Sequence, residues 1–125
     1  MQEEAISLLA PGKNLHDVQK AFKNVIAGHF SENERTELFQ FRSAHGLGHS
    51  YEDPVTSLPF PQDYLAPAEN KDAFMEIVPG MLFELHPNYF QKGVAGGCIG
   101  DMAYITEKGP VLLNTFPRQF IRWGR

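Results

Sequence analysis

The sequence contains one cysteine, no cluster of lysine or arginine, and no long apolar run. The single cysteine, Cys98, excludes an internal disulfide and makes a reducing, cytoplasmic environment the simplest expectation. Because Cys98 lies in a glycine-rich stretch, we expect a small buried thiol rather than a nucleophile. No segment approaches the roughly 18 apolar residues that a membrane-spanning helix needs, so no membrane contact is predicted.

Positive charge is scattered rather than concentrated in this sequence. Lysine and arginine number 11 against 15 aspartates and glutamates, which gives a formal net charge of −4. Nucleic-acid backbones are bound by concentrated positive charge, so we expect no nucleic-acid partner. The 125 residues, 42% of them hydrophobic, fit a single globular domain over residues 1–125. A chain of this size buries roughly two-thirds of its unfolded surface, enough for one modest core.

Two helices are predicted near the N-terminus. Residues 2–9 have an amphipathic pattern that the following Pro-Gly pair ends, and they resemble the last turns of a longer helix, with Met1 an alternative start. Asn14 is the predicted N-cap of a second helix, whose apolar residues recur at spacings of three and four as far as Gly28. The Ser31–Glu34 segment matches a capping box that opens a short element.

The rest of the chain favours strands and one long loop. Residues 53–79 hold five of the nine prolines and little periodicity, which predicts a long ordered loop. Strands are predicted at 38–43, 81–86, 97–106 and 110–114, with a hairpin turn at 107–109. This order of elements indicates an α+β fold, in which an antiparallel sheet carries helices on one face.

Candidate site residues gather in the stretch "SAHGLGHSYEDP" at 43–54. His45 and His49 flank a Gly-Leu-Gly, and histidine offers both a pKa near neutrality and a nitrogen that binds metal. Glu52 could act as a general base, or serve only as a solvated loop acid. The glycines could equally form a turn with no function. His86 falls on the same side of its predicted strand as Glu84, where a hydrogen-bonded structural histidine is the commoner case.

Four stretches, in order, resemble the second half of the "pita-bread" catalytic domain of the creatinase, prolidase, aminopeptidase P and methionine aminopeptidase superfamily. "AISLLAPGKNLHDVQKAF" resembles its helix, Pro-Gly turn and next helix. "HGLG" with "EDP" resembles its His-Gly-x-Gly segment. "VPGMLFELHPNYF" resembles its Pro-Gly-Met-x-Phe-x-x-Glu-Pro strand. "IGDMAYITEKGPVLLNTFPRQFI" resembles its Ile-Glu-Asp strand, Thr-Glu-x-Gly turn and closing Phe-Pro-Arg.

The resemblance implies a centre in which two divalent metals, held by two Asp, one His and two Glu, activate water against a peptide carbonyl. His45 matches the ligand histidine, and His49 takes that role in a second possible register. Glu52 stands where the family has its catalytic second histidine. His86 and Gly100 replace the two glutamates, which leaves Asp101 as the nearby acid. Both aspartates belong to a half-domain that precedes residue 1.

From the resemblance we expect a C-terminal fragment of a metallopeptidase-like hydrolase related to Xaa-Pro dipeptidase, with catalytic residues His45, His49 and Glu52. The full-length parent is expected to bind Mn, Zn, Co or Fe. The isolated chain is expected to be inactive and to hold at most one metal ion, on His45, His86 and Asp101.

Two alternatives remain open at this stage. One is a metal-free, creatinase-like hydrolase or lyase acting on a small carboxylate substrate instead of a small peptide. The other is a non-catalytic binding or dimerisation module.

A solitary half-domain exposes a sheet edge, so a homodimer is expected. Tyr51, Phe60 and Tyr64 are candidates for lining the substrate pocket, with simple packing over the sheet as the competing interpretation.

Overall fold

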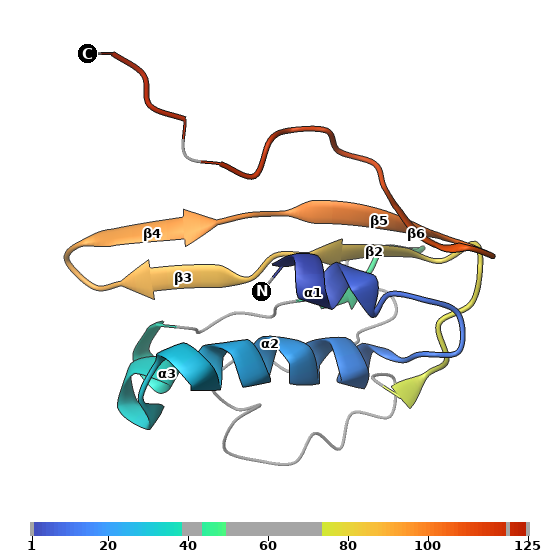
Figure 1. Cartoon of the computed structure of the whole chain (residues 1–125), viewed down its shortest axis with the longest axis horizontal. Helices are drawn as coiled ribbons and strands as arrows, with labels where there is room; N and C mark the ends of the chain where they lie inside the picture. The colour runs from blue at the N-terminus through green and yellow to red at the C-terminus, as the bar shows by residue number, and fades with distance from the viewer. Residues whose placement is uncertain (1, 39–43, 50–73, 120, 125) are drawn as a thin grey trace.

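In the computed structural model, the described residues are 2–38, 44–49, 74–119 and 121–124. They form a four-stranded antiparallel sheet, a two-stranded hairpin and three helices (Figure 1). The sheet has the order β1-β2-β5-β6, from strands Ala44–Gly46, Leu82–Leu85, Asp101–Thr106 and Gly109–Leu112. Helices α1 (Gln2–Ser7) and α2 (Leu15–His29) lie on the same side of this sheet (Figure 1). The predicted α+β class, with an antiparallel sheet covered by helices, is confirmed.

Helix α2 begins where the sequence predicts it. The Asn14 side chain accepts a hydrogen bond from the backbone N–H of Asp17 at 3.0 Å, and the Asp17 carboxylate accepts one from the backbone N–H of Asn14 at 3.4 Å. This reciprocal capping box satisfies two backbone donors that the first turn leaves without a helical partner. The second predicted capping box also forms, because Glu34 accepts hydrogen bonds from Ser31 before α3 (Glu32–Leu38).

The core lies between the helices and one face of the sheet. Strand β5 alternates between buried and exposed residues, which places Ala103 and Ile105 against the helices and leaves Met102 and Tyr104 exposed on the other face. The buried apolar cluster comprises Ala5, Leu9, Leu15, Val18, Phe22, Ala44, Ile77, Phe83, Leu85, Ala103 and Ile105. The apolar stripe predicted for α2 supplies three members of this cluster.

The hairpin of β3 (Asn88–Gln91) and β4 (Ala95–Cys98) was not predicted. The sequence suggested one strand over 97–106, but the structure interrupts it at Ile99–Gly100 and pairs the two parts with different partners. The hairpin extends beyond the four-stranded sheet (Figure 1). Its residues are mostly exposed, so they lack the buried, alternating face that would have marked two separate strands.

Several other expectations have a definite outcome. Cys98 is exposed, which contradicts the predicted buried thiol, because all four residues of β4 are exposed. The predicted strand at 38–43 falls largely outside the described residues, as do residues 53–73 of the predicted loop. The described end of that loop places Ile77 in the core and pairs Glu76 with Asn14 in a β-bridge. No helix in the described part of the chain is long and apolar enough to span a bilayer.

Candidate functional site

His45 occupies the middle of β1 and is fully buried. It pairs with Glu84 on β2, and Glu84 pairs in turn with Met102 on β5. Paired residues of an antiparallel sheet point to the same face, so His45 and Glu84 share the face opposite α1 and α2. His45 Nε2 lies 3.6 Å from Glu84 Oε2, and His45 Nδ1 lies 3.0 Å from the carbonyl oxygen of Gly46.

His86 follows β2 directly and lies beside His45. The two ring centroids are 5.0 Å apart, with an interplanar angle of 65° that places the edge of one ring against the other. The Asn88 side-chain amide lies 3.2 Å from His86 Nδ1 and donates to it, which assigns the proton of a neutral imidazole to Nε2. In this arrangement His86 hydrogen-bonds to Asn88 and contacts the His45 ring with its own ring.

Asp101 lies on the opposite face of the sheet from His45. It pairs with Leu85, which pairs with Ala44, and all three are buried toward the helices. The structure therefore does not assemble the expected trio of His45, His86 and Asp101. The physical reason is the pleat: neighbouring strand residues face opposite ways, and the register gives Glu84, not Asp101, to the face of His45.

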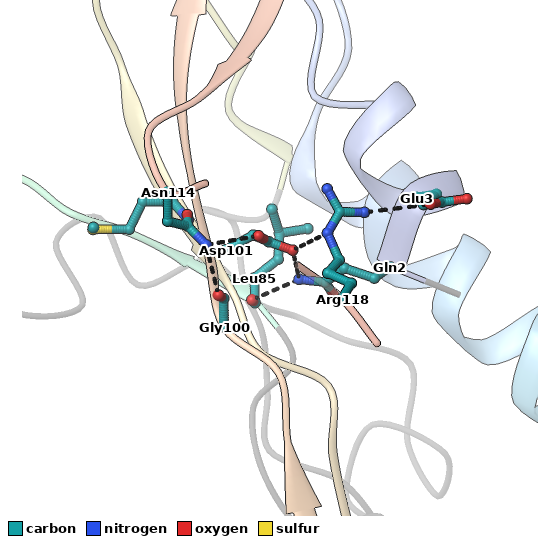
Figure 2. A network of polar contacts seen from close by, with 8 residues as sticks. Gln2, Glu3, Leu85, Gly100, Asp101, Asn114 and Arg118 are labelled. Atoms are coloured by element: carbon teal, nitrogen blue, oxygen red, sulfur yellow. Dashed lines mark hydrogen bonds and ion pairs between the residues drawn. The ribbon is translucent and has the colours of Figure 1, made fainter. Parts of the chain in front are cut away.

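Asp101 instead anchors a buried polar network (Figure 2). Its Oδ2 accepts from Gln2 Nε2 at 2.9 Å and from Arg118 Nε at 3.0 Å, and its Oδ1 accepts from Asn114 Nδ2 at 2.8 Å. Arg118 also reaches Glu3 of α1, at 3.7 Å. This network ties the first helix and the segment after β6 to the start of β5. The motif resemblance included Arg118 in Phe-Pro-Arg but did not identify its partner.

The remaining predicted site residues contribute less to the described geometry. His49 is exposed and lies three residues after β1. Glu52 lies outside the described residues, as do Tyr51, Phe60 and Tyr64. Glu84, which contacts His45, was not selected from the sequence. The sequence pattern did indicate that Glu84 shares one side of an alternating strand with His86. The pairing of Glu84 with His45, however, depends on the register between strands, which the pattern does not give.

The described donors do not fit a two-metal centre. Across residues 2–38, 44–49, 74–119 and 121–124, no group of three or more His, Cys, Asp or Glu side chains is placed to hold a metal ion. Asp101 already accepts three hydrogen bonds on the other face. His45 and Glu84 form a His–carboxylate pair within 4 Å, and this pair suits at most one cation.

Comparison with known families shows to which family of proteins this chain belongs. Residues 1–107 match the model of metallopeptidase family M24, and the chain belongs to that family. The resemblance inferred from the four motifs is thereby confirmed at the level of the family.

Individual relatives are dipeptidases and other peptidases by name. The chain is 29% identical over 121 residues to "Probable dipeptidase PepE" of Mycobacterium tuberculosis, covering 96% of this chain and 28% of the relative. It is 31% identical over 120 residues to an uncharacterized peptidase of Staphylococcus saprophyticus, covering 94% of this chain and 29% of the relative. The chain thus spans under a third of the length of these relatives.

Solved structures share the fold. Dipeptidase PepE from Mycobacterium ulcerans superposes with a TM-score of 0.70 at 25% identity, over 96% of this chain and 28% of that one. The Xaa-Pro dipeptidase from Bacillus anthracis also gives a TM-score of 0.70, at 21% identity, over 96% of this chain and 29% of that one. The arrangement of helices and sheet is therefore that of one part of these larger enzymes.

Proposed function

We propose that this chain is the C-terminal part of an M24 hydrolase that cleaves small peptides in the manner of dipeptidases and prolidases. The observation that carries the proposal is the buried His45 of β1, which lies beside Glu84 within a fold matched by the family over residues 1–107. The names of the similar proteins support a small peptide as substrate. His49 and Glu52 remain the proposed partners of His45 in catalysis.

A divalent cation, Mn, Zn, Co or Fe, is proposed for the full-length protein, where it would lower the pKa of a bound water and polarise the peptide carbonyl. His45 would bind it through Nε2, because Nδ1 already donates to the carbonyl of Gly46. The buried imidazole is held in one orientation by that hydrogen bond and by the adjacent His86 ring. His45 and Glu84 are only two of the five ligands that a two-metal centre needs, so we propose that the isolated chain does not turn over peptides.

The test compares this chain with a longer protein that contains it. Each is assayed against a panel of dipeptides, including Xaa-Pro dipeptides, with Mn²⁺, Co²⁺ or Zn²⁺ added. We expect turnover by the longer protein only, and a loss of about 100-fold or more in its kcat/KM on His45→Gln. His16→Gln is the matched control, because His16 stacks on Phe74 away from the sheet face of His45. Full activity of the His45→Gln variant would contradict the proposal.

A homodimer is proposed for the chain on its own. Met102, Tyr104, Val111 and Leu113 are each 40–51% exposed around β5 and β6, and together they form an apolar surface on the face opposite the helices. A second copy covering this surface would remove it from water. Light scattering after size-exclusion chromatography is expected to give twice the 14.1 kDa chain mass. A monomer that persists at all concentrations would exclude the dimer.

A cytoplasmic location is also proposed, because the single cysteine cannot form an internal disulfide and a reducing compartment suits it.

A further inference from the structure

We propose that the C-terminal tail, residues 121–124, docks into an apolar groove on a second copy of this chain, with Ile121 and Trp123 as the side chains that fill the groove. This contact goes beyond the homodimer proposed above, which is assigned to the face of β5 and β6, and it uses different residues. Two copies that exchange their tails make the same contact twice, so the exchange closes as a dimer.

The groove lies between the β3–β4 hairpin and the segment that leads to the tail. Its volume is about 610 Å³, within the range of roughly 300–1,000 Å³ that ligand pockets have. Tyr89 and Gly97 pair across the hairpin, so they face the same way and form part of its floor. A Cβ atom built on Gly97 would meet nothing within 4 Å, so the missing side chain leaves this part of the groove open. Ile99 and Phe116 add apolar walls.

The tail carries exposed apolar side chains in an alternating pattern. Ile121 is 57% exposed and Trp123 is 97% exposed. Because they are two residues apart, an extended backbone points both to one side and Arg122 to the other. The tail runs away from the body of the chain (Figure 1), and neither apolar side chain lines the groove of its own copy. The groove and these two side chains therefore suit each other but do not meet within one chain.

Opposite charges favour docking between two copies. Residues 118–125 contain three of the 11 basic residues and no acid. The rest of the chain contains the other 8 basic residues and all 15 acidic ones, which gives it a formal charge of −7. A segment of charge +3 is therefore attracted to the body of a second copy, and salt screens this attraction.

Strand β4 offers backbone partners to an extended segment. Among the residues that the structure describes, β4 pairs with β3 alone, so its other edge has no strand beside it. An extended peptide can add to such an edge through main-chain hydrogen bonds, with alternate side chains entering a neighbouring hollow. A tail along β4 with Ile121 and Trp123 toward the groove would leave Arg122 in water.

The test measures docking of a separate tail. The receptor is the full chain with Trp123→Ser, which contains no other tryptophan, and the ligand is a synthetic peptide of residues 118–125. We expect saturable binding, seen as a blue shift of the tryptophan emission of the peptide and weakened by added salt. The matched control peptide carries Ile121→Arg/Arg122→Ile, which keeps composition and charge but breaks the alternation. It should bind about tenfold more weakly.

Receptor variants locate the site. Adding Ile99→Ser to the receptor removes an apolar wall and should weaken binding about fivefold or more. Adding Val94→Ser, which changes a 72% exposed side chain outside the groove, is the matched control and should leave affinity unchanged. In a nitrogen-15 NMR titration of the receptor, the amide shifts should centre on Gly97 and Ile99. If the Ile99→Ser chain fails to fold, this titration decides.

Several results would overturn the proposal. They are the absence of saturable binding, equal affinity of the two peptides, and amide shifts centred on Met102 and Tyr104. In the unmodified chain, the Trp123 emission should move to the blue only as the mass doubles. Blue emission at the mass of a monomer would show the tail in its own groove and would also overturn the proposal. None of these measurements depends on turnover or on the face of β5 and β6, so their failure leaves the proposed activity and the dimer through that face to their own assays.

Discussion

Asp101→Asn is expected to destabilise the fold strongly, because Asp101 is 2% exposed and accepts three hydrogen bonds. An asparagine keeps the shape but replaces one acceptor oxygen with a donor. If the amide replaces Oδ2, it faces the donors of Gln2 and Arg118; if it replaces Oδ1, it faces the Asn114 amide. Each hydrogen bond to a buried charged group contributes about 1.5–3 kcal/mol, so losing one and weakening two predicts a cost of about 2–4 kcal/mol.

The ion pair with Arg118 accounts for only part of that cost. The Arg118 side chain is 25% exposed, and water therefore screens its attraction to Asp101. Arg118→Met, which retains the aliphatic stem, should cost about 1–2 kcal/mol. In a double-mutant cycle the two changes share one interaction, so together they should cost about 1 kcal/mol less than the sum of their separate effects.

The assay is urea unfolding followed by far-ultraviolet circular dichroism. Trp123 is 97% exposed, so its fluorescence would report poorly on the core. Lys108→Met, in the exposed β5–β6 turn, serves as a control for removing a positive charge and should change stability by less than about 0.5 kcal/mol. A cost below about 0.5 kcal/mol for Asp101→Asn, or strict additivity in the cycle, would refute the reasoning.

Three further predictions follow from local contacts. Asn14→Ala removes the N-cap of α2 and should lower the free energy of unfolding by about 1 kcal/mol in the same urea assay. An unchanged free energy of unfolding would contradict this role of the Asn14 side chain. The pKa of Glu34 is lowered from 4.5, chiefly by the Ser31 hydroxyl and then by the Ser31 backbone N–H, so its stabilisation of α3 is present above pH 4.5 and is lost as the pH falls through the lowered pKa. Dichroism from pH 6 to 3 should show less acid-induced helix loss in Glu34→Gln than in the unmodified chain, and identical curves would contradict this. Cys98 is exposed and should react with a thiol reagent in the folded protein as fast as in urea; a need for denaturant would show that the thiol is covered.

Local sequence patterns predicted much of the fold. The cap at Asn14 and the apolar spacing predicted α2, and the turn at 107–109 predicted the hairpin of β5 and β6. These signals act between residues close in the chain, so one sequence is enough to find them. The family motif likewise drew attention to His45, which the structure buries in β1 beside His86.

Features that depend on long-range pairing escaped prediction. The break at Ile99–Gly100 appears only when β4 pairs with β3 while β5 pairs with β2. Exposure of Cys98 depends on which layers cover β4, and the sequence around it carries no such information. Glu84 and Asp101 are both acids within predicted strands, yet their side chains lie on opposite faces of the sheet.

By itself, the sequence determined the helices, most strands of the sheet, the family and the candidate histidine, His45. Only the tertiary structure decided which acid accompanies that histidine. Glu84 shares its face, whereas Asp101 turns to the helices and is held by Gln2, Asn114 and Arg118. The reason is that side chains alternate along each strand, but hydrogen bonds between distant strands set the register that chooses which residues meet.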